Sequence, residues 1–423
     1  MGEKHANKLN ILFITEFFPN TVQPWFLNIV EQSILNGYHA TIVAYKKLGS
    51  KQPAKFKKLN LKKNTYYYLA GSSSYVGFMF LRLLLFILTK PKFSLSIFVK
   101  LCKRKYSQNL SYLKLVKEIL RVPVLNKKID IIHAHHLISA YEYLFIKDLF
   151  DVPLVVTFHG QPPIGVPHLN QVQMLELFIL SDVFLVNTNF AKRQLIHLGC
   201  VSEKIKVIPQ GIELDEFKFL STRNNKTFIF LTVGRIDKNK GHEYAIYAIR
   251  DLISKGIKIK YYIVGYGPYI DDLIDLVNEL GLNEQVQFLG EVEGSRLSQY
   301  YLLADIFLFP STSIDPGNLS VSHETQGVVV QEAQASGAIV IASSSGGIPE
   351  CLDRDVSAFV FQDRNVSDLT ETLLYVLNNS DKWEEWRLLA RNWVEKNFDI
   401  RKIGNRLNEE VYLPLIASHS FGK

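Results

Sequence analysis

The chain has 423 residues, of which 47% are hydrophobic and 21% are charged, and this length predicts two or three globular domains with sizeable cores. Its three cysteines lie far apart without a CxxC pair, which excludes a disulfide framework and a cysteine-based zinc site and is typical of a reducing compartment. The net charge of +7 would permit nucleic-acid binding, but the sequence contains no recognisable nucleic-acid module, so we expect no nucleic-acid partner.

The N-terminal segment does not resemble a secretion signal, because its apolar run is only about five residues long and is broken by Glu16. We therefore expect a cytoplasmic protein.

Short runs rich in Ile, Val and Phe alternate with helix-period segments, a pattern that predicts an α/β protein with parallel strands and crossover helices. The polar stretch 221–226 separates two sets of strands and is interpreted as an interdomain connection. We expect two doubly wound, Rossmann-like domains facing each other across a cleft, 1–209 and 210–399, with a C-terminal helix at 400–423 packing back on the first. The expected strands are 10–15, 40–45, 130–135, 153–159, 182–188 and 206–210, then 228–234, 260–267, 286–291, 305–311, 338–344 and 358–363.

The first half of the chain is strongly basic. Residues 1–210 contain 27 basic against 11 acidic residues, and the window 46–128 contains 20 basic residues and a single acidic one. The same window carries the apolar run 75–89. This combination predicts a surface that lies on anionic lipid or meets an acidic substrate.

A second interpretation of the apolar run remains open. Leu81, Leu84, Leu85 and Leu88 repeat at helical spacing and would equally form a core-facing stripe beside a solvated basic face. Because Arg82 interrupts the run, we do not expect a membrane-spanning helix.

Histidines gather where two predicted strands of the first half end. His133, His135 and His136 suggest a metal site, but alternate residues of a strand point to opposite faces and no suitably spaced carboxylate joins them. We therefore expect them to mark a strand end at the interdomain cleft. His159 stands at the tip of another strand beside Gly160, which makes it a candidate site residue, although a satisfied core histidine is the usual interpretation of such a position.

Two cations follow the first strand of the second half. Arg235 and Lys240 lie five residues apart, so both can reach one site beyond the sheet, where a forked guanidinium and a compact ammonium suit phosphate oxygens. Solvated loop cations are the alternative. The sequence has no convincingly placed DxD pair, since Asp237 lies on a basic loop and Asp271 and Asp272 start a helix, so we expect no metal cofactor.

The strongest pattern is HETQGVVVQEAQASG at 323–337, where Glu324 and Glu332 lie eight positions apart across a strand-to-helix transition. Gly327 between them allows close backbone approach to a ligand, and the first amides of the following helix offer an anion the positive end of a helix dipole. Read alone, either carboxylate would be a solvated surface group. Together with the glycine they predict a binding site.

These segments resemble the retaining GT-B glycosyltransferases of the glycosyl transferases group 1 family (family 4). The EX7E segment followed by A-x-A-x-G is the most specific match. The others, in chain order, are VIPQGIELDEF at 207–217, VGRIDKNKGHEYAI at 233–246, IVGYGP at 263–268, VQFLGEV at 286–292 and SSSGGIPE at 343–350.

The resemblance implies a role for each candidate residue. Arg235 and Lys240 would hold the diphosphate of a nucleotide-sugar donor together with backbone amides near Gly327 and Val328. Glu332 would accept from the ribose hydroxyls, and Glu324 would accept from hydroxyls of the transferred sugar and steady positive charge at its anomeric carbon. His159 would contact the same sugar, and backbone groups near Gly290 and Val292 would frame the base, uracil or guanine.

The chain departs from the family pattern in two places. Many members have adjacent glycines after the first strand, whereas this chain reads TEFFPNTVQPWFLN at 15–28, which changes the acceptor pocket. Gln326 and Gln331 replace commoner aromatic and aliphatic residues, which indicates a subfamily. The basic, apolar first half resembles members that glycosylate lipid-linked intermediates during exopolysaccharide, lipopolysaccharide or O-antigen assembly, which implies a polyprenyl-diphosphate or glycan acceptor and peripheral attachment to the inner membrane face.

Two other functions remain possible from the sequence. A nicotinamide-dependent oxidoreductase could use paired Rossmann-like units, but GxGxxG is absent after the first strand. A non-catalytic saccharide-binding or scaffold protein could keep the same fold.

Overall fold

The computed structural model describes residues 9–19, 24–47, 53–67, 127–160, 169–223, 226–292, 294–313, 322–354 and 356–421, and the single residues 88, 124, 315 and 318. Most of the basic window 46–128, including nearly all of the apolar run 75–89, lies outside the described residues. Within the described ranges, none of the helices combines the length and the apolarity needed to cross a bilayer.

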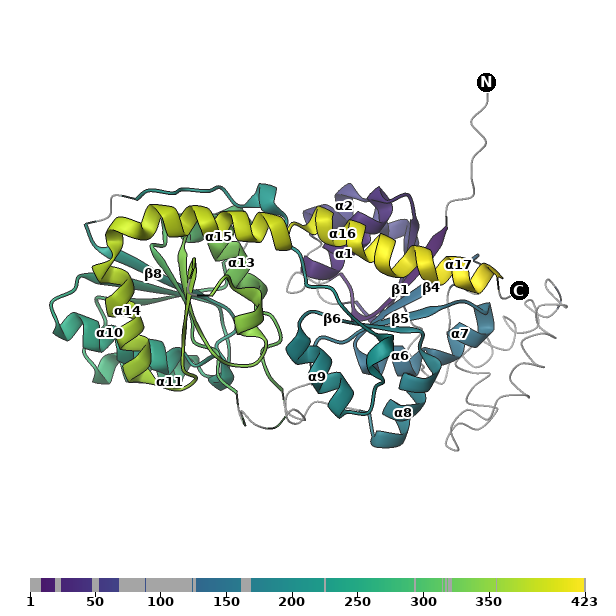
Figure 1. Ribbon diagram of the computed structural model, residues 1–423, viewed down its shortest axis with the longest axis horizontal. Coiled ribbons are helices and arrows are strands. Elements are labelled where there is room, and N and C mark those ends of the chain that lie inside the picture. Colours follow the sequence, from purple (N-terminus) through teal and green to yellow (C-terminus); the bar gives the residue numbers. More distant parts are fainter. Residues whose placement is uncertain are drawn as a thin grey trace, which may run out of the picture.

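Two separate parallel sheets form the centres of two domains (Figure 1). The first has seven strands in the order β3-β2-β1-β4-β5-β6-β7 and the second has six in the order β10-β9-β8-β11-β12-β13. The first sheet contains β1 (Asn10–Phe17), β2 (His39–Lys46), β3 (Thr65–Tyr67), β4 (Ile131–His135), β5 (Leu154–Thr157), β6 (Val183–Val186) and β7 (Ile205–Val207). The second contains β8 (Phe228–Val233), β9 (Ile259–Val264), β10 (Val286–Gly290), β11 (Ile306–Phe309), β12 (Ile339–Ser343) and β13 (Ala358–Phe361).

The predicted α/β class with two Rossmann-like units is confirmed, and each of the twelve expected strands is present. The additional strand, β3, pairs in parallel with β2 through Thr65–Tyr67. Its three residues are too few to show the alternation on which strand prediction depends.

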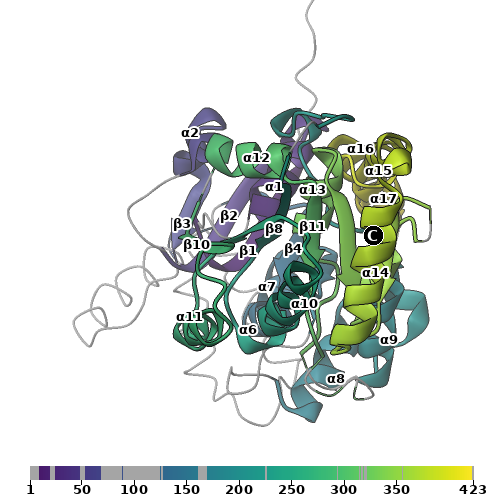
Figure 2. The ribbon, with the colours of Figure 1, turned by 90° about the vertical axis from the view of Figure 1, so that its left-hand side faces the viewer.

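Helices cover both faces of each sheet (Figure 2). Buried apolar side chains form two clusters against each sheet, as expected for strands that are covered on both sides. The helices of the first domain are α1 (Pro24–Leu35), α2 (Ala54–Lys58), α6 (Leu137–Glu142), α7 (Leu144–Phe150), α8 (Gln171–Leu180) and α9 (Asn189–His197). Those of the second are α10 (His242–Ser254), α11 (Ile270–Glu279), α12 (Gly294–Leu303), α13 (Val328–Ala335), α14 (Val366–Asn378) and α15 (Trp383–Asn397).

The chain end returns from the second domain to the first. Helices α15, α16 (Ile400–Leu407) and α17 (Leu413–Phe421) run in succession along one side of the molecule (Figure 1). On the first domain, Ile400, Ile403 and Leu407 pack in the same buried cluster as residues of α1 and β1. The C-terminal helices therefore join the two domains.

Two chain segments cross between the domains, the linker at 209–213 and the segment 398–400, and they are hydrogen-bonded to each other. The backbone N–H of Ile212 donates to the carbonyl of Phe398 at 2.8 Å, and that of Ile400 donates to the carbonyl of Ile212 at 3.0 Å. Gly211 lies where they touch, and a Cβ there would come within 2.8 Å of the Ile400 Cα. Only glycine therefore lets these two connections approach so closely. The stretch 221–226 was expected to be the interdomain connection, but its residue Arg223 bonds to carbonyls of the second domain, so that expectation is wrong.

Candidate functional site

The sheet order of the second domain identifies where a ligand would bind. Strands number upward from β8 toward β10 on one side and from β11 toward β13 on the other, so the order reverses between β8 and β11. In open parallel sheets, ligands bind beyond the carboxyl ends of the strands at such a switch point. Arg235 and Lys240 follow β8, and the loop carrying Glu324 follows β11. The predicted candidates thus gather at the expected place.

Lys240 and Glu324 form an ion pair at this edge. The Lys240 ammonium donates to Oε2 of Glu324, and the two side chains are 22% and 19% exposed. The ammonium also lies 5.8 Å from the ring centroid of Phe309, the last residue of β11. The pair is half-buried and balanced in charge, so an anion that binds Lys240 competes with Glu324 for the ammonium.

Gly327 lies directly in front of α13 and has φ +76°. A Cβ at this position would come within 2.6 Å of the Phe309 ring, so a side chain is excluded by space as well as by backbone conformation. No side chain caps the start of α13, where Val328 is the first residue. The first amides of this helix are therefore available to an anion from outside the helix.

Glu332 lies one turn further along α13 and accepts a hydrogen bond from the Tyr301 hydroxyl at 2.7 Å. Tyr301 is fully buried on α12. The pKa of Glu332 is raised to about 7, mainly by burial; the hydrogen bond from Tyr301 lowers it and the nearby charge of Glu216 raises it. The carboxyl group is thus positioned by a buried phenol and titrates near neutral pH.

Arg235 belongs to the same loop but not to the same ion pair. Its guanidinium bonds to Asp237, two residues along the chain, and its side chain is 64% exposed. Arg235 and Lys240 both follow β8, as their spacing implies, whereas the bond between Arg235 and Asp237 was not predicted. A cation this exposed can turn toward a ligand at little cost.

Gly290 and Val292 lie at the outer part of the same edge. Gly290 ends β10 in the left-handed region, with φ +67°, and its carbonyl accepts from the backbone N–H of Gly265 at 2.9 Å. Val292 packs partly buried against the apolar cluster beneath. Strand β9 lies between β10 and β8, so Gly290 and Val292 are two strands away from the loop that carries Lys240. A ligand that contacts both places would have to be extended.

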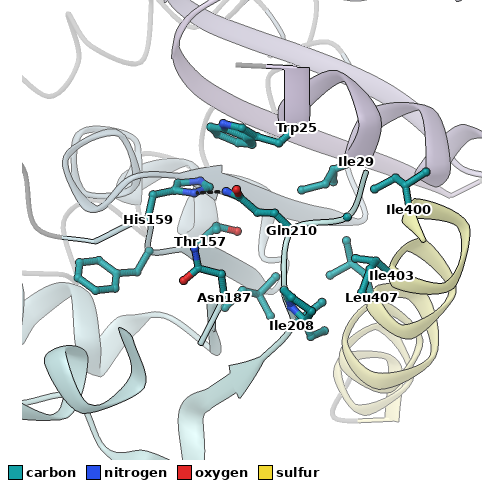
Figure 3. A pocket seen from close by; sticks show the side chains of 14 residues that line it. Trp25, Ile29, Thr157, His159, Asn187, Ile208, Gln210, Ile400, Ile403 and Leu407 are labelled. Atoms are coloured by element: carbon teal, nitrogen blue, oxygen red, sulfur yellow. Dashed lines mark hydrogen bonds between the residues drawn. The ribbon is translucent and has the colours of Figure 1, made fainter. Parts of the chain in front are cut away.

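His159 follows β5 in the first domain, and both of its ring nitrogens are engaged. Nδ1 lies 3.0 Å from Nε2 of Gln210 (Figure 3), and Nε2 lies 3.2 Å from Nδ1 of His135. The ring of Trp25 lies against it, tilted by 39°, at a centroid distance of 4.1 Å. Burial, followed by the nearby His136 and His133, holds the pKa of His159 well below its usual value. The ring is therefore neutral at physiological pH.

The loop that carries Glu324 packs directly on the first domain. Thr325 accepts from the Asn187 side chain at 2.9 Å, and its carbonyl accepts from the Thr188 hydroxyl at 2.9 Å. The Thr325 hydroxyl lies 3.4 Å from the carbonyl of His159, and a Cβ on Gly160 would come within 2.8 Å of the Thr325 methyl group. The structure thus brings His159 and the Glu324 loop together across the domain junction.

The glycines of the segment 343–350 hold the other side of this loop. The backbone N–H of Gly347 donates to the Glu324 carbonyl at 2.9 Å, and a Cβ on Gly347 would lie 2.1 Å from the carbonyl oxygen of Thr325. This close backbone contact fixes the loop from which the Glu324 side chain projects.

A small pocket lies beneath His159, between the first domain, the linker and α16 (Figure 3). The side chains of Trp25 and Ile29 from α1 and of Ile403 from α16 line it, and His159 and Gln210 supply polar groups at one end. Sequence reasoning missed Trp25, Gln210, Tyr301 and Phe309 as site residues. Of these four residues, only Trp25 lies in a segment, 15–28, that the sequence marks as a departure from the family pattern.

Metal coordination was not expected from the sequence. Among the described residues, no group of three or more His, Cys, Asp or Glu side chains is arranged to hold a metal ion. His133 instead makes hydrogen bonds with Tyr412 at 2.6 Å and Thr157 at 2.7 Å.

Comparison with known protein families gives two matches along the chain. Residues 214–393 match the family model described as Glycosyl transferases group 1, and residues 93–216 match that described as Glycosyltransferase Family 4. The first match contains every candidate residue of the second domain.

Similar proteins carry related names. The Arabidopsis thaliana sulfoquinovosyl transferase SQD2 is 27% identical over 322 residues, 71% of this chain and 58% of the relative. The Erwinia amylovora amylovoran biosynthesis glycosyltransferase AmsK is 30% identical over 249 residues, 58% of this chain and 60% of the relative. The match with these two relatives spans somewhat less than two thirds of their length.

Among solved structures, Anabaena HepE in complex with UDP superposes with a TM-score of 0.67 at 16% identity, covering 95% of this chain and 99% of that protein. HepE has also been solved with UDP-glucose, where the TM-score is 0.66. At this identity the likeness establishes the fold, which is the GT-B arrangement of two Rossmann-like domains.

Proposed function

We propose that this chain, which belongs to the glycosyl transferases group 1 family, transfers a sugar from a nucleotide-sugar donor to a saccharide or lipid-linked glycan in cell-surface polysaccharide biosynthesis. The observation that carries the proposal is the convergence of Lys240, Glu324 and the uncapped start of α13 at the switch point of the second sheet. Transfer with retention at the anomeric centre is part of the proposal and is supported by the family resemblance.

The donor diphosphate would lie between the β8 loop and α13. Lys240 and Arg235 would supply cationic charge to the phosphate oxygens, and the amides following Gly327 would supply the positive end of the helix dipole. We propose that these groups take the place of a metal ion. Activity unaffected by EDTA would support this assignment, whereas activity lost to EDTA and restored by Mg²⁺ would contradict it.

The nucleoside would extend from this point along the sheet edge. Glu332 would accept from the ribose hydroxyls through the oxygen that Tyr301 leaves free, and the backbone near Gly290 and Val292 would frame the base. UDP and UDP-glucose in the HepE structures favour a uridine donor, with guanosine as the alternative.

Glu324 and His159 would act on the transferred sugar. Arrival of the diphosphate would draw Lys240 away from Glu324, and the released carboxylate would accept from sugar hydroxyls and stabilise positive charge at the anomeric carbon. The leaving diphosphate would help to deprotonate the acceptor on the same face, so no residue here needs to be a strong base.

We also propose peripheral attachment of the first domain to the cytoplasmic face of a membrane, where a polyprenyl-diphosphate-linked acceptor would reside. Lys57 and Lys58 on α2 and Lys62 and Lys63 directly after it are exposed, whereas the side chain of Lys55 turns inward to Glu31 and Glu213. These four exposed lysines, beside buried apolar residues of the same segment, form a positively charged surface that attracts anionic lipid.

Sedimentation with anionic vesicles tests this attachment. Replacing Lys57, Lys58, Lys62 and Lys63 by Gln should abolish it, and replacing four exposed lysines of the second domain should not. The matched control set is Lys226, Lys255, Lys258 and Lys396. Equal binding by both variants would contradict the proposal.

Calorimetric titration with UDP and GDP, followed by an assay of donor turnover with a lipid-linked acceptor, tests the main proposal. Nucleotide binding with turnover supports a glycosyltransferase. Absence of nucleotide binding would overturn the proposal, and nucleotide binding without turnover of any donor would favour the non-catalytic alternative.

A further inference from the structure

Gln326 clamps the interdomain linker with its side-chain amide. Its Oε1 accepts from the backbone N–H of Gln210 at 2.8 Å, and its Nε2 donates to the Gln210 carbonyl at 2.8 Å. One amide side chain therefore satisfies both backbone polar groups of a single residue. Gln326 is 1% exposed, so water does not compete for either bond.

A second glutamine holds the clamp from below. Gln331 is fully buried in α13, and its Oε1 accepts from Gln326 Nε2 at 3.3 Å. The Gln331 amide in turn lies 3.4 Å from the carbonyl of Cys351. The two glutamines of the EX7E segment thus form one buried chain of amides that ends on the linker.

The clamped residue determines which ring nitrogen of His159 carries the proton. Gln210 presents Nε2 to His159 Nδ1 at 3.0 Å, and in this orientation of the amide its nitrogen donates and Nδ1 accepts. With the amide so oriented, the neutral ring of His159 carries its proton on Nε2. That N–H faces Nδ1 of His135 at 3.2 Å, which accepts it.

The same reasoning places a proton on Nε2 of His135. This nitrogen is buried and has no hydrogen-bond partner within the described ranges. Each hydrogen bond in this series therefore has its donor on the same side: Gln210 donates to His159, and His159 donates to His135. Burial lowers the pKa of both histidines, so neither ring becomes charged and changes an acceptor nitrogen into a donor. The ring of Trp25 packs against His159 at a centroid distance of 4.1 Å and limits its movement.

We propose that Gln326 and Gln210 are positioning residues that hold His159 in the Nε2–H tautomer and set its orientation from the Glu324 loop of the opposite domain. The inference rests on the proposed function only where it places His159 beside the transferred sugar. There a sugar hydroxyl oxygen would replace His135 Nδ1 as the acceptor of the Nε2–H, a bond that a bare ring nitrogen could not make in the same way.

The test reverses the donor at position 210. A carboxylate only accepts, so Gln210→Glu should move the His159 proton to Nδ1 or make the ring an imidazolium, which long-range proton–nitrogen NMR of the labelled ring detects. The turnover number should fall about tenfold, the change expected for a lost buried hydrogen bond, while UDP affinity stays unchanged. The control is Gln171→Glu, the same change at an exposed position on α8.

A second variant covers loss of the clamp. Gln326→Met removes both bonds to Gln210 and should lower the turnover number, and Gln326→Glu, which keeps the acceptor to the Gln210 N–H but turns an oxygen toward the Gln210 carbonyl, should lower it as well. A Nδ1–H tautomer in the wild-type protein, or an unchanged ring spectrum in Gln210→Glu, would overturn the inference. Failure of the wild-type protein to bind UDP or GDP would overturn the proposed function while leaving the tautomer result intact.

Discussion

The second domain brings charged side chains to the junction, whereas the first brings neutral ones. Lys240 pairs with Glu324 and Arg235 pairs with Asp237, and all four side chains retain some exposure. In the first domain, burial holds the pKa of His159 far below its usual value, and its ring is held by hydrogen bonds and by contact with the Trp25 indole. The two regions therefore recognise a ligand by different means.

The difference indicates how work would be divided between the domains. A half-exposed ion pair exchanges one partner for a ligand at moderate cost, because water already screens part of the attraction. A buried network of neutral groups cannot exchange one of its partners for a ligand without losing hydrogen bonds that water does not replace. We therefore expect the second domain to govern donor affinity and the first to govern the geometry of transfer.

The largest effect is expected at Glu324. In Glu324→Ala, transfer should fall by about 100-fold or more, because a charge that stabilises the reacting centre is removed, while nucleotide affinity changes little. Steady-state kinetics together with calorimetric titration measure the two quantities separately. Glu384→Ala, at an exposed position on α15, serves as the control. Full activity in Glu324→Ala would refute its assigned role.

Lys240 should affect binding more than turnover. In Lys240→Met, UDP affinity should fall about tenfold or more because a charge-assisted bond to phosphate is lost, and UMP affinity should fall less. Lys238→Met is the control, since that lysine is exposed in the same loop. An equal loss for UDP and UMP would mean that Lys240 does not contact the second phosphate.

Gly327 tests whether space at the start of α13 matters. Gly327→Ala should destabilise the protein by about 2 kcal/mol or more, since the new methyl group meets both an unfavourable backbone region and the Phe309 ring. Gly256→Ala is a matched control, since Gly256 has φ +81° but a Cβ there would meet no atom within 4 Å. Denaturant unfolding of both variants isolates the contribution of the ring. Equal losses of unfolding free energy in the two variants would show that the Phe309 ring moves aside at no measurable cost.

The raised pKa of Glu332 predicts that stability depends on pH in the direction opposite to that expected for His159 of the first domain. Its pKa is raised from 4.5 to about 7 in the folded state, so the folded protein binds the proton more tightly than the unfolded chain. Its contribution to the free energy of unfolding should therefore fall as pH rises from about 4.5 to about 7 and then level off. Ribose binding should strengthen over the same rise, because the ionised carboxylate accepts better.

Glu332→Gln should remove this pH dependence from both stability and UDP affinity. The folded-state pKa of His159 is lowered, so its contribution to stability falls as pH drops below about 6.5, where the unfolded chain gains a proton that the folded ring resists. Unfolding curves of the Glu332→Gln variant across pH distinguish the two groups. A decline with rising pH that persists in the variant would assign the titration to another residue.

The strands and the position of the site could be predicted from the sequence, because both follow from apolar periodicity and from motifs in continuous segments. The partners of the site residues could not. Lys240 and Glu324 are 84 residues apart and meet because β8 and β11 are neighbours in one sheet. Gln210 and Gln326 are 116 residues apart and meet because the linker packs against the second domain. In the sequence, Gln326 and Gln331 were departures from the family pattern, and only the fold shows that Gln326 bonds to the linker and Gln331 to Gln326.

The smallest effect is expected where a charge of the first domain meets the linker. Lys55 on α2 bonds to Glu213, lies 2.9 Å from Glu31 and donates to Asn28 at 2.6 Å. Burial lowers its pKa, but the two carboxylates outweigh this effect and raise it. Lys55→Met should lower the free energy of unfolding by only about 1 kcal/mol, because the methionine keeps the apolar stem and Lys58 remains 3.7 Å from Glu31.

The same variant sharpens the contrast between the domains, because Lys55 is a first-domain cation that lies outside the proposed donor site. UDP affinity in Lys55→Met should match the wild type, whereas Lys240→Met loses affinity, and both are measured by the same titration. Lys58→Met, which removes the more distant partner of Glu31, should change neither stability nor affinity measurably. If Lys55→Met weakened UDP binding as much as Lys240→Met, donor affinity would depend on how the linker joins the domains, and the proposed division of work between them would fail.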